Sequence, residues 1–186
     1  MSAIAVTSTY VKRLIILLLV PLFFLSAADT PQLDEKNTNA IIKSSYVYNF
    51  CKLISWPQSK NNGNFIIGVL GDPGLYKQLI SKYSNKLIGN QPIEIIQLLG
   101  TEQMPNLHVL FVSRSRVTNM PAISNKMQKA HTLVIAEHPD GIKNGATLNF
   151  VVIDNQLKFE VGETNASDYG LTIGITLKSL AYKVVK

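Results

Sequence analysis

The sequence contains a single cysteine, Cys51, so the chain cannot form an internal disulfide bond. Small secreted domains often depend on disulfides for stability, and this class is therefore excluded. The apolar neighbours of Cys51 include Phe50 and Leu53, an environment typical of a buried and unreactive thiol. We expect a buried thiol; pairing with a cysteine of another molecule is the alternative.

The chain also lacks an apolar run of the roughly 20 residues that a membrane-spanning helix requires. Its longest run, Leu14–Leu25, has 12 residues and includes Pro21. The basic pair Lys12–Arg13 precedes the run and the small residues Ser26–Ala28 follow it, which is the order of a secretory signal peptide. We therefore predict a cleavable signal peptide over residues 1–28, with a membrane anchor as the alternative.

A strong excess of one charge is absent as well. Cleavage after Ala28 leaves residues 29–186, a length typical of a single domain. This mature chain has 16 basic and 12 acidic residues, and its basic residues never form a run longer than two. Nucleic-acid-binding proteins concentrate basic residues on one face, so we expect no nucleic-acid partner.

Catalytic and metal-binding patterns are missing. The sequence has three histidines, and no pair of them has the spacing of a metal site. Ser113 and Ser115 lie outside any nucleophile-elbow pattern, and the glycine turn at residues 71–74 lacks the dinucleotide-binding spacing. The sequence therefore predicts a protein that is not an enzyme and has no catalytic residue, metal or cofactor.

Helical and strand-like segments alternate through most of the mature chain. A first helix is expected from about residue 37 until just before Pro57, where proline disfavours helical geometry. Its apolar positions recur at helical spacing and include Ile41, Ile42, Tyr46, Phe50, Leu53 and Ile54. Further helices are predicted at residues 75–87 and 121–130. Runs rich in β-branched residues predict strands at residues 65–70, 93–98, 109–112 and 132–136.

The pattern changes near the C-terminus. Residues 147–153 and 157–161 flank a polar turn and predict a β-hairpin. A last helix is expected from about residue 165 or 170 to Val185, weakened in its first turns by two glycines. The predicted fold class is α/β, with a mostly parallel mixed sheet flanked by helices on both faces and a C-terminal hairpin and helix.

Two polar loops follow predicted strands. Asp72 lies in a loop that opens a helix, and the loop Ser113–Arg116 follows another strand. Loops of this kind line the crevice at the carboxyl ends of parallel strands, and helix N-termini and arginines bind anions. We therefore name Asp72, Ser113, Arg114 and Arg116 as candidate ligand-binding residues for a small anion. An ordinary turn with solvated arginines is the alternative.

An aromatic stripe runs through the first helix and just beyond it. Tyr46, Tyr48, Phe50 and Trp56 belong to it, and most of these side chains are expected in the core. Because Trp and Tyr dominate interface hot spots, Tyr48 and Trp56 are our candidate partner-binding residues.

Five ordered blocks of this sequence resemble the YfiR-like family of periplasmic proteins. The segment from Ser45 to Pro57, SYVYNFCKLISWP, is similar to the opening helix of that family. The other blocks are Gly68–Asp72, His108–Ser113, Asn144–Phe150 and Phe159–Val161, the last followed by Gly170–Leu171. Together they cover about residues 43–184, nearly the whole mature chain.

The resemblance implies a periplasmic regulator without known chemistry. The namesake of the family represses a membrane diguanylate cyclase by contacting its periplasmic domain, and members tend to dimerise. An inner-membrane diguanylate cyclase and a second copy of the chain are thus the expected partners. The alternative is a periplasmic module that binds a small anionic ligand.

The sequence departs from the family pattern in three places, and these limit which family properties are expected of this chain. Gly162 replaces the usual asparagine, and Gly174–Ile175 replaces a serine pair. The cysteines that form redox-sensitive disulfides in better-known members are absent, so a redox-switched mechanism is not expected for this chain.

Overall fold

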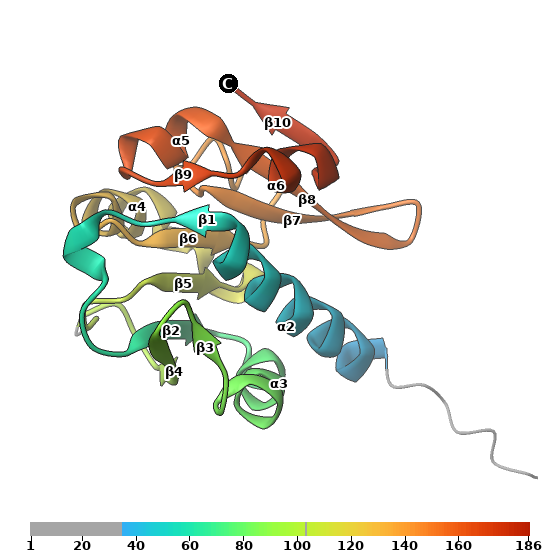
Figure 1. The fold of residues 1–186 in the computed structure, drawn as a ribbon. Coiled ribbons are helices and arrows are strands. Elements are labelled where there is room, and N and C mark those ends of the chain that lie inside the picture. The colour runs from blue at the N-terminus through green and yellow to red at the C-terminus, as the bar shows by residue number, and fades with distance from the viewer. Residues whose placement is uncertain (1–34, 103) are drawn as a thin grey trace, which may run out of the picture. The chain divides into compact units, whose positions relative to one another are not determined.

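The computed structural model describes residues 35–102 and 104–186, of which Glu35–Lys186 form one compact unit. The predicted signal peptide and its cleavage site lie outside the described residues. Figure 1 shows the fold, whose elements carry the labels used below. In the part of the chain described, no helix is long and apolar enough to cross a bilayer.

The helices include α2 (Glu35–Leu53), η2 (Gln58–Lys60), α3 (Pro73–Tyr83), η3 (Arg114–Asn119), α4 (Met120–Lys129), α5 (Glu163–Asp168) and α6 (Ile175–Leu180). The strands include β1 (Ile54–Ser55), β2 (Phe65–Leu70), β3 (Leu87–Ile88), β4 (Gln91–Leu98), β5 (Val109–Val112), β6 (Leu133–Ala136), β7 (Leu148–Ile153), β8 (Gln156–Gly162), β9 (Thr172–Ile173) and β10 (Lys183–Val185).

Eight strands form one sheet in the order β10-β8-β7-β6-β5-β2-β4-β3. Neighbouring strands from β7 to β4 are parallel, whereas β7 pairs antiparallel with β8 and β4 pairs antiparallel with β3. All residues of the central strands β5 and β6 are buried, as expected for parallel strands covered on both faces. The predicted α/β class and mostly parallel mixed sheet are therefore confirmed.

Helices cover both faces of this sheet (Figure 1). The β2-α3-β4 and β5-α4-β6 crossovers leave the sheet centre in opposite directions, and right-handed crossovers then place α3 and α4 on opposite faces. The helix α2 packs beside α3. Under α2, the Phe50 ring packs against Phe159 and Phe150, with centroid distances of 4.8 and 5.9 Å. This aromatic cluster joins the helix to the C-terminal hairpin.

The buried face of α2 differs from the predicted one. Ile42 is exposed, and Tyr46 and Leu53 are only partly buried. The buried residues of the helix are Ala40, Lys43, Ser44, Val47, Phe50 and Cys51. Apolar residues occur all round α2, so their spacing did not decide which side of the helix faces the core.

The predicted C-terminal helix is wrong in its extent. Only Ile175–Leu180 is helical there, preceded by the short helix α5 and the strand β9, and followed by β10. Ile173 in β9 pairs with Ile54 in β1, and the amide of Gly174 donates to the carbonyl of Leu53 at 2.9 Å. Long-range pairing with the end of α2 thus replaces the helical turns that the local apolar spacing indicated. Likewise, the second predicted helix ends at Tyr83, and Leu87 belongs to β3.

Candidate functional site

The sheet has a topological switch point between β2 and β5. From β2 the chain moves outward to β4, and it then returns to β5 on the other side of β2. In open α/β sheets, ligands bind at the carboxyl ends of the strands at such a point. The loops that start at Gly71 and Ser113 both begin here, so the structure brings the two predicted loops together.

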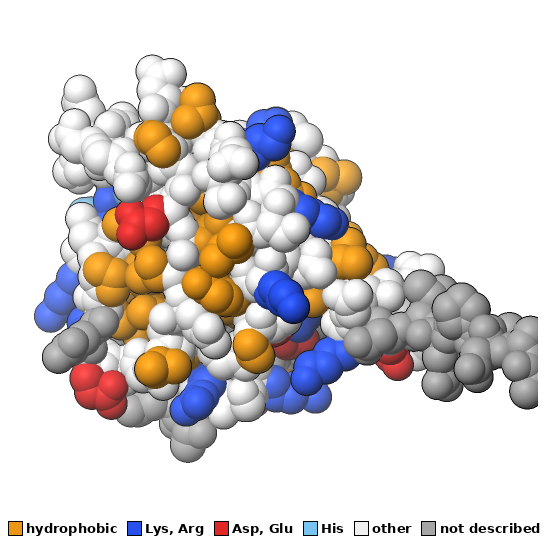
Figure 2. Space-filling model, turned by 90° about the horizontal axis from the view of Figure 1, so that it is seen from below, with side chains coloured by type: hydrophobic (Ala, Val, Ile, Leu, Met, Phe, Trp, Pro, Cys, Tyr) orange, Lys and Arg blue, Asp and Glu red, His pale blue; other side chains and the backbone are white. Residues whose placement is uncertain are grey.

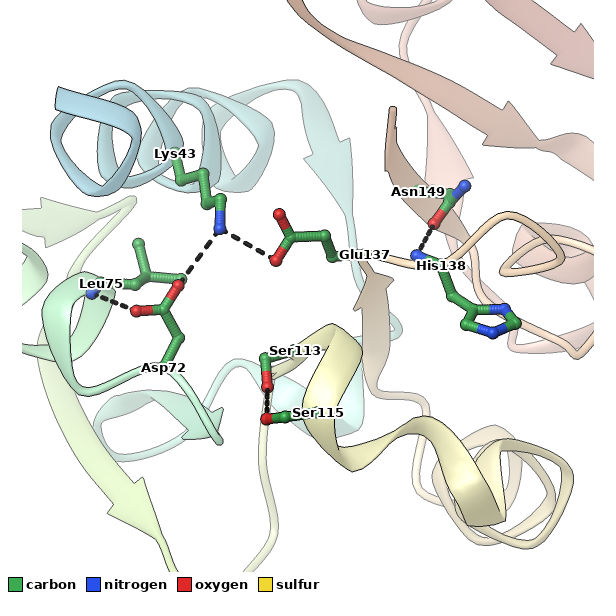
Figure 3. Close-up of polar contacts among 8 residues, drawn as sticks. All are labelled: Lys43, Asp72, Leu75, Ser113, Ser115, Glu137, His138 and Asn149. Atoms are coloured by element: carbon green, nitrogen blue, oxygen red, sulfur yellow. Dashed lines mark hydrogen bonds and ion pairs between the residues drawn. The ribbon is translucent and has the colours of Figure 1, made fainter. Parts of the chain in front are cut away.

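Asp72 has two structural roles in this crevice. Its Oδ1 atom accepts a hydrogen bond from the Leu75 amide at 2.9 Å and caps α3. Its Oδ2 atom accepts from the ammonium group of Lys43 at 3.2 Å (Figure 3). Both carboxylate oxygens of this predicted ligand-binding residue are therefore already engaged by the protein.

Lys43 was missed by sequence reasoning, yet it occupies the crevice. Its side chain is only 9% exposed, and its Nζ atom lies 2.9 Å from Oε2 of Glu137, the residue directly after β6. Figure 3 shows the ammonium group between Asp72 and Glu137. The same group lies 5.6 Å from the centroid of the Phe111 ring. A lysine at a core-facing position of α2, between Ala40 and Val47, was the signal that could have identified it.

This cluster ties three elements together. Lys43 comes from α2, Asp72 from the start of α3 and Glu137 from the end of β6. Leaving a buried charge without its partner costs about 3–5 kcal/mol. The two ion pairs of Lys43 therefore favour the arrangement in which both carboxylates stay beside its ammonium group. With one positive and two negative groups, the buried part of the crevice is not a site for an anion.

The arginines lie at the outer part of the crevice. Arg114 and Arg116 are exposed on η3, and neither guanidinium group makes a hydrogen bond or ion pair with another described residue. The Ser113 hydroxyl is 2.9 Å from that of Ser115. Gly71 has a φ of +85°, and a Cβ atom there would collide with Ser113 Oγ and Arg116 Cγ. Only glycine therefore allows the two loops to approach this closely.

The candidate partner residues lie away from the crevice. Tyr48 is partly buried and stacks on Tyr83 of α3 with centroids 4.4 Å apart, and Lys52 lies over its ring. Trp56 is partly buried too, and its indole N–H donates to the carbonyl of His108 at 3.1 Å. Each ring thus has an internal packing role and is partly exposed.

Trp56 also lines a cavity of about 590 Å³ beside the end of α2. Cys51 lies in the wall of this cavity but is 1% exposed. Burial raises the pKa of the Cys51 thiol well above its ordinary value, so the reactive thiolate is suppressed. The expectation of a buried cysteine is confirmed.

His108 stands behind Trp56 as a core histidine. Its Nδ1 atom accepts from the Ile66 amide at 3.1 Å, and its Nε2 atom is 2.8 Å from the carbonyl of Lys60, which makes Nε2 the donor. Burial is the main cause that lowers the pKa of His108. Nearby, burial lowers the pKa of Lys60 to about 8. Both groups brace the start of β5, and no cluster of metal-ligating side chains occurs among the described residues.

Comparison with known proteins decides the family. A model of the family described as YfiR/HmsC-like matches residues 40–182. The chain belongs to the YfiR/HmsC-like family. Proteins of this family are periplasmic regulators rather than enzymes, in keeping with the resemblance of the five sequence blocks. No curated protein matches the sequence.

One solved structure supports the fold of this YfiR/HmsC-like chain. A conserved domain protein from Vibrio cholerae O1 biovar El Tor N16961 superposes with a TM-score of 0.52 at 13% identity. The match covers 76% of this chain and 60% of that protein, so the chain spans less than two thirds of its length. An ABC domain in complex with L-Trp from Streptococcus pneumoniae has a TM-score of 0.46 at 12% identity, with 64% of this chain and 55% of that one covered.

The motif residues of the YfiR/HmsC-like chain have mainly structural roles here. Asn149 of the Asn144–Phe150 block is fully buried. Its Oδ1 atom accepts from the His138 amide at 3.1 Å (Figure 3), and its Nδ2 atom donates to Glu160 at 3.0 Å. The amide side chain thereby fixes the loop after β6 against the hairpin. The sequence gives no local signal for this role beyond the asparagine's place in the motif.

Proposed function

We propose that this protein is a periplasmic regulator that binds the periplasmic part of an inner-membrane diguanylate cyclase and represses its output. The observation that carries the proposal is the family match over residues 40–182. The leader sequence supports export. Repression is then a population shift, in which the regulator favours the inactive state of the cyclase only by binding it more tightly.

Export is the first requirement of this proposal. The protein, expressed with its own leader, should be recovered from the periplasm with Asp29 at its N-terminus. A product that still begins at Met1 and sediments with membranes would support the membrane anchor instead.

Tyr48 and Trp56 are the residues we propose for the contact with the cyclase. Both are partly buried aromatic residues at the same end of α2, the kind of residue that anchors interfaces. A matched pair of variants separates binding from folding. Tyr48→Ala and Tyr83→Ala abolish the same ring stack, so they should cost similar stability. Only Tyr48→Ala should strongly reduce capture of the cyclase, measured by co-purification at equal protein levels.

Trp56 needs a milder substitution because it packs on Phe65 at a centroid distance of 5.0 Å. Trp56→Ala would remove this packing, at a cost below the about 3–5 kcal/mol of a fully buried ring because Trp56 is only partly buried. Trp56→Phe retains most of the packing and deletes the indole N–H. Reduced capture of the cyclase by a folded Trp56→Phe protein supports the role of Trp56, whereas unchanged capture contradicts it.

A periplasmic module for a small anionic ligand is the second candidate function. The observation in its favour is the pair of exposed arginines, Arg114 and Arg116, at the switch point of the sheet, without a carboxylate partner among the described residues. Ser113 would complete this outer site. Asp72 is retained in the proposal only as the cap that positions α3, because its oxygens bind Leu75 and Lys43.

A further inference from the structure

One edge of the sheet is formed by β4 and is unpaired over most of the length of that strand. β4 has eight residues, but β3 pairs only with its first two, Leu87 with Pro92 and Ile88 with Gln91. On its other side, β4 pairs with β2 from Ile93 to Leu98. Within the described residues, no strand pairs with the outer side of this stretch.

The backbone direction at this edge can be assigned. The Ile93 amide donates outward to the carbonyl of Lys86 at 3.2 Å. Backbone groups of successive strand residues alternate in direction with period two. Ile95 and Gln97 therefore also point their N–H and C=O groups outward, where they form a template for another strand.

Features that commonly protect an edge are scarce here. The stretch Ile93–Leu98 has the sequence IEIIQL, with no lysine, no proline and Glu94 as its one charge. The Glu94 carboxylate already accepts from Asn64 at 2.9 Å. Large apolar side chains flank the edge, since Leu87 is 54% exposed and Leu99 is 84% exposed. Natural edges carry charges, proline or bulges when they must stay unpaired.

The surface around this edge is compatible with an interface. Figure 2 views the molecule from the side where α3, β3 and β4 lie in Figure 1. Apolar side chains occupy much of the middle of this surface, and lysine and arginine side chains lie mostly toward its rim (Figure 2). An apolar centre with a charged rim is the common layout of a protein interface.

We propose that β4 pairs antiparallel with β4 of a second copy of this chain, about a two-fold axis at Ile96, so that the two sheets become one. In this register Ile95 forms a hydrogen-bonded pair with Gln97 of the second copy, and Gln97 with its Ile95. Ile96 faces Ile96 of the second copy directly.

The strand is self-complementary in this register. Glu94 faces Leu98 of the second copy, so the two carboxylates are not opposite each other and like charges do not meet. The Ile93 amide, already bonded to Lys86, is not required. The pairing ends at Leu98, because Lys86 already occupies the position opposite Ile93 that Leu99 of the second copy would reach. A closed two-fold contact of this kind uses the same patch twice, and it does not depend on the membrane partner proposed above.

Cysteine cross-linking tests the register. In an antiparallel non-hydrogen-bonded pair the Cα atoms lie about 4.5 Å apart, within the range of a disulfide. The full chain with Ile96→Cys should therefore give a covalent dimer under mild oxidation. Glu94→Cys, on the same face of the strand, should not, because the two positions lie four residues apart along the pair. The buried Cys51 leaves little background reaction.

Two edge variants test the contact itself. Ile96→Lys places two ammonium groups opposite each other, and Gln97→Pro deletes an outward donor without touching the ladder to β2. Both should shift the protein from dimer to monomer in light scattering, while Ile96→Thr stays dimeric. Circular dichroism checks that each variant folds. If one of the two does not fold, the other still tests whether the edge forms the dimer contact.

Three results would overturn the proposal. The first is a wild-type protein that stays monomeric at concentrations of tens of micromolar. The second is a dimer that persists in the folded edge variants and fails to cross-link through Ile96→Cys. The third is a monomeric wild type whose edge variants lose repression, which would assign the edge to a strand of another protein.

Discussion

Lys43 and Glu137 form an ion pair of 2.9 Å across 94 positions of sequence. The pair joins α2, which carries the candidate partner residue Tyr48, to the carboxyl end of a central strand. Asp72 completes the cluster at 3.2 Å from the same ammonium group. The first helix is therefore fixed to the sheet both by apolar packing and by a buried network of charges.

The first prediction concerns this network. Lys43→Met should lower the free energy of unfolding by about 3–5 kcal/mol, because two partly buried carboxylates lose their counter-charge. The control is Lys178→Met, which breaks the Lys178–Glu163 pair, whose side chains are 34% and 38% exposed. Solvent screens exposed pairs of that kind, so their loss should change stability little. Urea unfolding measures both changes, and equal losses would contradict a special role for Lys43.

A companion variant checks the cause. In the Lys43→Met background, Glu137→Gln should recover part of the lost stability, since it neutralises one of the orphaned carboxylates. The same change in the wild type should be destabilising. Additive effects of the two substitutions would mean that the pair is not coupled.

Local sequence patterns predicted the sheet well because its central strands are short, apolar and rich in β-branched residues. The runs 65–70, 109–112 and 132–136 match β2, β5 and β6 to within one residue. The first two helices were predicted to start at about residues 37 and 75, and they start two residues earlier, at Glu35 and Pro73. These features depend on a few neighbouring residues, so they can be predicted from the sequence.

The rest depended on contacts between distant segments. Ile173 pairs with Ile54, and the segment Lys183–Val185 pairs with β8, neither of which leaves a local trace. Lys43 appeared as an ordinary surface lysine because its partners lie 29 and 94 positions away. The sequence thus predicted the two loops of the candidate site. It did not predict that the ammonium group of Lys43 fills the crevice between them.

The second prediction concerns His108 and pH. Burial lowers the pKa of His108 in the folded state below its ordinary value of 6.5. The unfolded chain then binds more protons, so stability is fully present above about pH 6.5 and decreases as pH falls through the folded pKa. The buried Lys60, with a pKa of about 8 against 10.5 when unfolded, changes its contribution only in a higher pH range.

Unfolding free energies between pH 7 and pH 5 measure this effect. His108→Gln should flatten the profile, because glutamine does not titrate. Its amide side chain still offers an acceptor for the Ile66 amide and a donor for the Lys60 carbonyl, so the fold is retained. His138→Gln, on a more exposed histidine, should leave the slope unchanged. A slope that survives in the His108 variant would show that another group controls it.

The third prediction concerns the arginines at the switch point. If Arg114 and Arg116 hold an anion, a ligand at ten times its dissociation constant should stabilise the wild type by about 1.4 kcal/mol. Inorganic phosphate and a small dicarboxylate are suitable probes. Arg114→Glu with Arg116→Glu should abolish the effect. The matched control, Lys126→Glu with Lys129→Glu on α4, makes the same change in charge; equal shifts in all three proteins would contradict a site at the arginines.

The central claim is that this chain represses a membrane diguanylate cyclase from the periplasmic side. The most direct measurement is cellular cyclic-di-GMP in a strain without this gene, in a strain that also lacks the cyclase, and in the single deletion complemented with the gene. The account predicts a rise in the single deletion, no rise in the double deletion because the target is gone, and restoration by the complete chain but not by residues 29–186 made without a leader. Unchanged cyclic-di-GMP in the single deletion would contradict it.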